Sequence, residues 1–222
     1  MPVYQLTDAF VFPDPAMAEP DGLLAVGGDL HPARLVQAYI HGIFPWYNEG
    51  FPILWWSPNP RMVLVPGEFK RTKSLRQVVR NGGFKASFDM AFPQVIEACS
   101  TVKRDGQQGT WITHEMSEAY IRMFELGIAH SVEVLKNGRL VGGLYGLLLG
   151  KVFFGESMFH LESNASKVAL WYLVDRLLEM GVSLIDAQQD TPHMRLMGGR
   201  LMERKTFLTL LAQLTTDEYR YT

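Results

Sequence analysis

The chain lacks the features that direct a protein out of the cytoplasm or into a membrane. It contains a single cysteine, Cys99, so no internal disulfide can form, and a reducing compartment is expected. No run of about 18 apolar residues predicts a transmembrane helix. The first fifteen residues have neither the basic region nor the apolar region of a signal peptide. We therefore expect a cytoplasmic protein that does not contact a membrane.

Signatures of cofactor chemistry are also absent from the sequence. There is no phosphate-binding Gly-Lys loop and no dinucleotide fingerprint, so ATP or NAD use has no support. The six histidines and one cysteine form no spaced set of metal ligands, and we expect neither a metal nor a cofactor. The formal net charge of −2 excludes a general attraction to polyanions. Contact with a nucleic acid would therefore require a local basic patch.

Aromatic residues, by contrast, are concentrated in one stretch, "GIFPWYNEGFPILWWSPNPR" (residues 42–61), which holds three of the five tryptophans and four prolines. So many prolines predict a loop rather than one regular element. We interpret it as the junction of two domains, a small N-terminal α/β domain (1–61) and a larger domain (62–222). Within the first, Pro32 and Gly42 have the positions expected just inside the start and just past the end of a helix.

The larger domain shows alternating strand and helix patterns. Ser74 and Asp89 are expected to cap two helices, and Asn137-Gly138 predicts a tight β-hairpin. A long amphipathic helix ending at Gly181 precedes the strand "VSLIDAQQD". Hairpins followed by a helix and a further strand indicate an α+β fold with a mostly antiparallel sheet.

Three groups of residues have the chemistry of a functional site. Asp186 and Gln188 share one side of a strand, so the carboxylate could polarise the amide, or the strand could simply become polar as it reaches solvent. Glu156 lies among phenylalanines, where it would hold a cationic substrate group or be neutralised by an arginine. Residues 70–85 carry six basic side chains and no acid, which suits phosphates or a solvated helix face.

Several motifs, in this order and spacing, resemble those of the leucyl/phenylalanyl-tRNA–protein transferase family. They are "GLLAVGGDL", "AYIHGIFPWY", "WWSPNPR", "FFGESMFH", "NASKVAL" and "LIDAQQ". The resemblance implies transfer of Leu or Phe from Leu-tRNA or Phe-tRNA to the α-amine of proteins that begin with Arg or Lys, which marks them for degradation. It also implies a GNAT-like (N-acetyltransferase-like) C-terminal domain, no ATP or metal, and a monomer.

The resemblance assigns roles to single residues. Asp186 would polarise Gln188, whose carbonyl oxygen would accept a hydrogen bond from the attacking amine. Glu156 would bind the acceptor N-terminus, with Asp186 sharing this work. The remaining positions would form the donor pocket (Leu144, Phe153 and Ser157), the adenosine site (Trp111 and Trp46) and the tRNA contact (Lys73, Arg76 and Arg80).

Some positions depart from the family's pattern or have no assigned role. Leu196 stands where a His-x-x-Ser-Leu-Gly motif would have serine, and Leu144 replaces a bulkier methionine. His160 and His193 have no identifiable Ser or Cys partner, so we interpret both as structural or peripheral. An acyl-CoA N-acyltransferase and a non-catalytic RNA-binding module remain as alternative interpretations.

Overall fold

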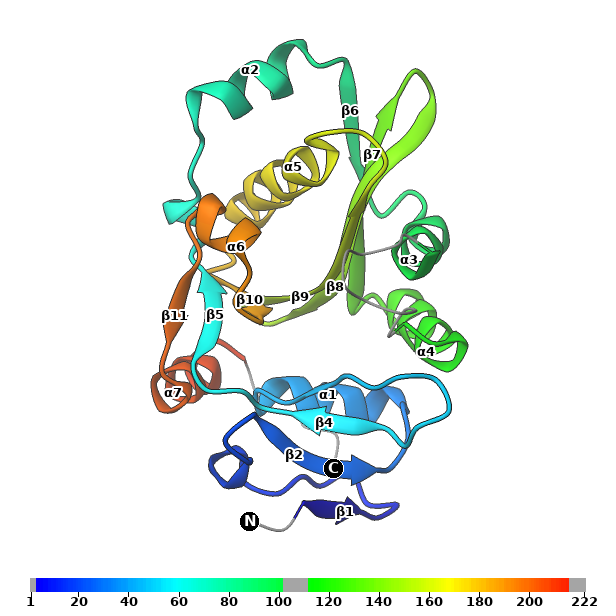
Figure 1. Ribbon diagram of the computed structural model, residues 1–222, viewed down its shortest axis with the longest axis vertical. Helices are drawn as coiled ribbons and strands as arrows, with labels where there is room; N and C mark the ends of the chain where they lie inside the picture. The colour runs from blue at the N-terminus through cyan, green and yellow to red at the C-terminus, as the bar shows by residue number, and fades with distance from the viewer. Residues whose placement is uncertain (1–2, 102–111, 216–222) are drawn as a thin grey trace.

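The computed structural model describes residues 3–101 and 112–215, and their strands form two separate sheets (Figure 1). The smaller sheet has the order β1 (Tyr4–Leu6), β2 (Leu23–Gly27), β4 (Leu54–Trp56) and β3 (Phe44–Pro45). The larger sheet has the order β11 (Arg200–Met202), β5 (Arg61–Leu64), β10 (Leu184–Gln188), β9 (Val152–His160), β8 (Arg139–Leu149), β7 (Ala129–Lys136) and β6 (Phe84–Phe88).

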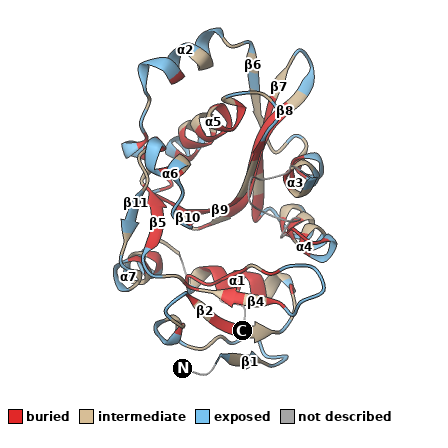
Figure 2. Cartoon of the chain, viewed as in Figure 1, coloured by how far each residue is buried: buried red, intermediate tan, exposed pale blue. Residues whose placement is uncertain are grey.

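Helices cover both faces of the larger sheet, and further helices lie beyond it. The helices are α1 (Pro32–Ile40), α2 (Lys73–Asn81), α3 (Phe92–Thr101), α4 (His114–Glu125), α5 (Ala165–Glu179), α6 (Pro192–Met197) and α7 (Arg204–Leu214), with short 3-10 turns at Pro15–Met17 and Pro66–Glu68. Helix α5 packs on β7 and β8 from one side, and α3 and α4 pack on the other. Helix α1 lies between the smaller sheet and the larger one (Figure 1). Buried residues follow these contacts, and α2 is mostly exposed (Figure 2).

The larger sheet confirms the predicted α+β class with mostly antiparallel pairing. Of its strand pairs among the described residues, β9 and β10 alone run parallel. Their pairing ends at Phe154 and Asp186, although β9 continues to His160 alongside β8. The sheet therefore opens between β9 and β10.

Two β-bulges lie at this opening. In β9 the extra residue is Glu156, opposite the Tyr145-to-Gly146 step of β8. In β10 it is Ala187, between Asp186 and Gln188. Because a bulge leaves its extra residue unpaired and bends the strand, it redirects the nearby side chains. The two bulges thus turn a carboxylate and an amide out of the ladder at the same place.

The aromatic stretch is more regular than expected. As predicted, it is not one regular element, but it is not wholly a loop either, since the short strands β3 and β4 within it pair antiparallel in the smaller sheet. Trp55 is fully buried there and donates a hydrogen bond to the carbonyl of Gly27. Trp56 donates to the carbonyl of Trp46, and the rings of these two lie 5.8 Å apart. The domain boundary at residue 61 stays a prediction.

Both predicted caps in the larger domain were wrong. Thr72, not Ser74, begins α2, and its hydroxyl accepts from the N–H of Leu75. Asp89 has a left-handed backbone (φ 60°), and its carboxylate accepts from the N–H of Ser131, so it serves the neighbouring strand and not a helix. The hairpin prediction was right, and Asn137 and Gly138 both have positive φ.

Among the helices that the structure describes, none combines the length and the apolar character needed to cross a membrane.

Candidate active site

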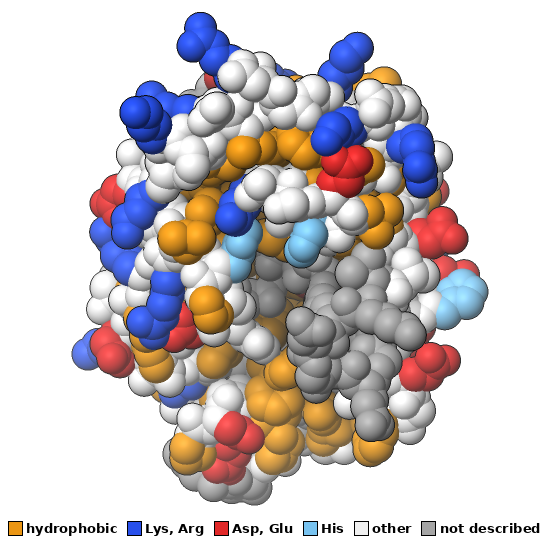
Figure 3. Space-filling model, turned by 45° about the horizontal axis from the view of Figure 1, so that its top comes forward, with side chains coloured by type: hydrophobic (Ala, Val, Ile, Leu, Met, Phe, Trp, Pro, Cys, Tyr) orange, Lys and Arg blue, Asp and Glu red, His pale blue; other side chains and the backbone are white. Residues whose placement is uncertain are grey.

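A cavity of about 680 Å³ lies where β9 and β10 separate. It is lined mainly from β3, β8, β9, β10, α5 and α6, and Figure 3 looks onto the hollowed face of the molecule. This size suits a small-molecule site with mostly apolar walls. Apolar side chains make up most of the wall, and the polar groups include Glu156, Gln188 and His193.

Behind the cavity, Arg61 and Asp186 form a fully buried ion pair. Arg61 donates from Nε and Nη2 to the two carboxylate oxygens of Asp186, at 2.8 and 2.7 Å. Nη1 of Arg61 donates to the carbonyl of Gly42 at 3.1 Å, and the Arg61 guanidinium lies over the rings of Phe44 and Phe207. Two-point pairing and added hydrogen bonds offset the cost of burying both charges. The pair therefore joins β5, β10, α7 and the smaller sheet.

Asp186 holds the backbone of Gln188 and not its side chain. The carboxylate accepts from the main-chain N–H of Gln188 at 2.9 Å, and Gln188 has a φ of 60°. A non-glycine residue keeps such a conformation only where its surroundings enforce it. The Gln188 amide instead donates from Nε2 to Glu156 Oε1 at 2.8 Å. The predicted polarisation of the amide by Asp186 is corrected accordingly, because Glu156 makes that contact.

Glu156 is the buried carboxylate that faces the cavity. Tyr120 donates to its second oxygen at 2.9 Å, and the Tyr39 hydroxyl hydrogen-bonds to that of Tyr120. Burial, together with the nearby charge of Asp186, raises the pKa of Glu156 to about 7, against the hydrogen bonds from Tyr39 and Tyr120, which lower it. Among the described residues no arginine neutralises it.

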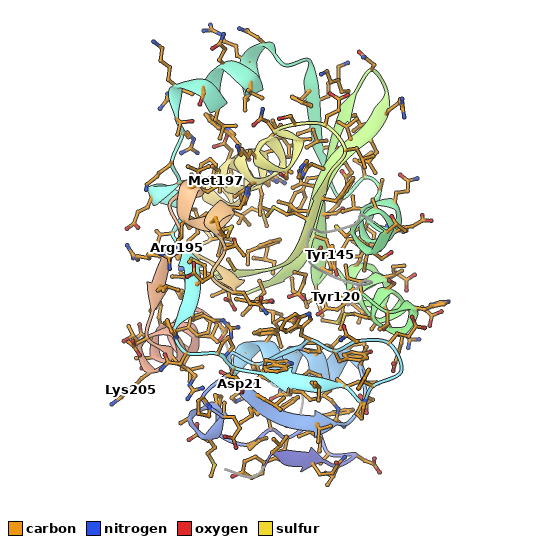
Figure 4. The ribbon with its side chains drawn as sticks, viewed as in Figure 1. Asp21, Tyr120, Tyr145, Arg195, Met197 and Lys205 are labelled. Atoms are coloured by element: carbon orange, nitrogen blue, oxygen red, sulfur yellow. The ribbon has the colours of Figure 1, made fainter. Side chains whose placement is uncertain are left out.

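The two tyrosines bring distant elements to this carboxylate. Tyr120 comes from α4 and Tyr39 from α1, and both are fully buried. Tyr120 lies beside Tyr145 of β8, with ring centroids 5.6 Å apart at 72° (Figure 4). Burial raises the pKa of Tyr39 and Tyr120 well above the ordinary value, so both hydroxyls keep their protons.

The residues predicted for the donor pocket and the adenosine site lie at the cavity as far as the structure describes them. Leu144, Phe153 and Ser157 line the cavity, as does the half-buried Trp46. Trp111 lies outside the described residues.

The basic residues Lys73, Arg76 and Arg80 are exposed on α2, at the end of the molecule far from the smaller sheet (Figure 1). They do not line the cavity. Their neighbour Arg71 is committed elsewhere, since it pairs with Asp175 at 2.5 Å and lies over the rings of Phe69 and Trp171.

Reasoning from the sequence missed several residues of the site. Arg61, Tyr39 and Tyr120 were given no role, and His160 and His193 were interpreted as structural or peripheral, yet both histidines line the cavity. A signal was available for three of them, because Arg61 closes the "WWSPNPR" motif, Tyr39 is the second residue of "AYIHGIFPWY" and His160 is the last of "FFGESMFH". Leu196, which stands where the family motif has serine, is 54% exposed on α6, so this position does not contribute to the packing of the core.

Two family descriptions match the sequence. Residues 63–212 match "Leucyl/phenylalanyl-tRNA protein transferase", and residues 28–59 match its N-terminal domain. Proteins named leucyl/phenylalanyl-tRNA–protein transferase from Desulfatibacillum aliphaticivorans and Syntrophobacter fumaroxidans are 52% and 55% identical over 96% of this chain and 91% of theirs. The one from Pseudomonas putida is 54% identical over 92% of this chain and 91% of its own.

Solved structures with a related arrangement include a GCN5-related N-acetyltransferase from Kribbella flavida, with a TM-score of 0.40 and 13% identity over 76% of this chain and 60% of that one. The L-PGS structure from Bacillus licheniformis has a TM-score of 0.41 and 10% identity over 73% of this chain and 51% of that one. At these scores the overlap is partial, and no functional conclusion follows.

Loss of Arg61 should destabilise the fold strongly. In Arg61→Met the Asp186 carboxylate stays buried without a counterion, which should lower the free energy of unfolding by about 3–5 kcal/mol. Arg200→Met removes a half-exposed arginine that pairs with Glu68 and should cost less than about 1 kcal/mol. Urea unfolding of the two variants measures the difference, and equal losses would contradict this account of Arg61.

Glu156 should make stability depend on pH. Its pKa is raised from 4.5 to about 7 by folding, so the folded protein binds the extra proton and this group's stabilising effect is lost as pH rises through about 7. Between pH 4.5 and 7 the free energy of unfolding of the wild type, relative to Glu156→Gln, should fall by on the order of 3 kcal/mol. Glu97→Gln removes the same charge from an exposed site of α3 as a control. Parallel curves for wild type and Glu156→Gln would contradict the burial of an ionisable Glu156.

Proposed function

The chain belongs to the leucyl/phenylalanyl-tRNA–protein transferase family, and from this membership we propose that the cavity between β9 and β10 is where an aminoacyl-tRNA meets a protein N-terminus. The chain is an aminoacyltransferase that moves an aminoacyl group from tRNA to a protein. The proposed donors are Leu-tRNA and Phe-tRNA, and the proposed acceptors begin with Arg or Lys. The chain works as a monomer in the cytoplasm, and its products are marked for degradation.

The chemistry requires placement of two substrates and transfer of one proton. The α-amine nitrogen forms a bond to the ester carbonyl carbon, and the bond from that carbon to the terminal ribose oxygen breaks. The nitrogen loses a proton and the ribose oxygen gains one. The ester is already activated, so correct placement of the two substrates supplies much of the rate.

The single observation that carries the proposal is the contact between Glu156 and Gln188. Because Nε2 of Gln188 donates to Glu156, the carbonyl oxygen at the other end of the amide is left to accept a hydrogen bond from the attacking amine. Glu156, with a pKa of about 7, takes the proton near neutral pH, where a general base works best. Its charge also attracts the cationic acceptor. Asp186 does not share this work, because Arg61 balances its charge.

The donor side chain occupies the apolar wall of the cavity. Leu144, Phe153 and Leu170 line it together with Ser157, and all but Ser157 are nearly fully buried. Leu and Phe are unbranched at the β carbon and fit this wall. Ile and Val are branched there, and the poorer fit weakens their binding by about 1–3 kcal/mol.

The tRNA is held by stacking and by phosphate contacts. Trp46, half-buried in the cavity wall, stacks on the terminal adenine, and Trp111 is the second proposed platform. Lys73, Arg76 and Arg80 on α2 contact the acceptor stem, where phosphates position the tRNA without reading its sequence. Figure 3 shows basic side chains spread around the upper rim of the hollow. Family membership sets aside both alternatives, the acyl-CoA enzyme and the non-catalytic RNA-binding module.

The proposed function is tested by transfer of leucine to a peptide that begins with Arg. With Leu-tRNA, mass spectrometry should show one added leucine, and Gln188→Ala should lower the rate about 10²-fold or more while leaving tRNA affinity within about twofold, because it removes a hydrogen bond made to the attacking amine.

Gln94→Ala, at an exposed glutamine of α3, provides the matched control and should keep the full rate. No product with either Leu-tRNA or Phe-tRNA, under conditions where the tRNA binds, would overturn the proposed donors. A wild-type rate in Gln188→Ala would instead remove Gln188 from the mechanism.

Binding through α2 should depend on salt. Arg76→Ala combined with Arg80→Ala should weaken tRNA binding and reduce the slope of log affinity against log salt by roughly one for each phosphate that is no longer neutralised. Lys205→Ala removes a charge from the exposed face of α7 and should leave the slope unchanged. The same slope in the double variant as in the wild type would place the tRNA elsewhere.

A further inference from the structure

One part of the cavity wall is lined by histidines that the reaction above does not use. His160 ends β9 and His193 lies in the first turn of α6. The Nε2 atom of His193 is shielded from solvent and makes no hydrogen bond with any residue of 3–101 or 112–215. Buried polar atoms normally have a partner, so an orphaned ring nitrogen in a cavity wall indicates a position that a ligand fills.

A lysine also lies beside this part of the wall. Lys167, in the first turn of α5, and His160 both lie near enough to His193 for their charges, after burial, to lower its pKa. Lys167 contacts the Asn164 side chain at 3.3 Å. Within the described part of the chain, none of the three basic residues forms an ion pair with a carboxylate. The Lys167 ammonium without a carboxylate partner, next to imidazole groups that can donate hydrogen bonds, favours an anionic ligand.

The positive group and the proposed base lie at different places along one strand. Glu156 and His160 are four residues apart on β9, which corresponds to roughly 13 Å in an extended strand. The cavity therefore has a carboxylate where the cationic acceptor is proposed to enter, and a rim with two histidines and the nearby Lys167 away from it. An anionic substrate is favoured at the rim, and a cationic one is repelled.

We propose that Lys167, His160 and His193 bind the phosphodiester group that precedes the terminal adenosine of the donor tRNA. The inference rests on the proposed function, in which Trp46 holds the adenine of that nucleotide in the same cavity. Lys167 supplies the charge, and the His193 Nε2–H donates to a phosphate oxygen. In this arrangement the rim holds the last phosphate while the ester extends toward Gln188.

Adenosine and adenosine 5′-phosphate separate this contact from the rest of the site, because they differ only in the phosphate. In the wild type, calorimetry should show roughly ten- to hundredfold tighter binding of the phosphorylated nucleoside, as for hydrogen bonds to a charged group. Lys167→Met and His193→Phe should each remove most of that preference while leaving the affinity for adenosine unchanged. Lys205→Met, an exposed lysine on α7 (Figure 4), removes the same charge far from the cavity and should keep the preference.

The other possible results would contradict the phosphate site, its assigned residues or the adenosine site. Equal binding of the two compounds by the wild type overturns the phosphate site and leaves the proposed function intact. A preference that survives in both Lys167→Met and His193→Phe places the phosphate on other residues and overturns the assignment. Failure of both compounds to bind, in a protein that still transfers leucine, overturns the adenosine site and the inference with it. If His193→Phe does not fold, as judged by circular dichroism, Lys167→Met alone decides.

Discussion

The buried pair of Arg61 and Asp186 is the constraint on which the site depends. The two residues are 125 positions apart, and their contact fixes β5 against β10 and connects both to the smaller sheet through the carbonyl of Gly42. Asp186, paired with Arg61, also accepts from the main-chain N–H of Gln188 and holds that residue in a left-handed conformation. The buried Asp186 carboxylate thus fixes the position of the Gln188 backbone. Glu156 has no arginine partner, and its pKa of about 7 lets it exchange a proton near neutral pH.

The two carboxylates show how surroundings divide the work between similar groups. Asp186 is held by a bidentate arginine and takes no proton in the proposed reaction. Glu156 has only uncharged partners in Tyr120 and Gln188, so burial dominates and raises its pKa. The β9 bulge turns Glu156 away from the ladder and makes this difference possible.

Local sequence patterns predicted several helices and turns, but they could not predict contacts between residues that lie far apart in the sequence. The Asn137-Gly138 hairpin and the helix from Pro32 followed from turn and cap chemistry that a short window contains. Thr72 and Ser74 are equally good caps by type, so the sequence could not choose between them. Asp89 was assigned to a helix because its true partner, Ser131, is 42 residues away. The family motifs predicted roles for Asp186, Gln188 and Glu156, but which of these groups contact one another depends on two β-bulges that periodicity does not reveal.

The hydroxyl of Tyr39 gives the smaller domain a part in the chemistry of the larger one. Helix α1 sends this side chain across to Tyr120, and through it the domain influences how tightly Glu156 holds its proton. The two segments of the chain match two distinct family descriptions. Because the hydroxyl link crosses between the two segments, a chimera that joined the larger domain to a partner without a tyrosine at this place would carry a Glu156 with a different proton affinity.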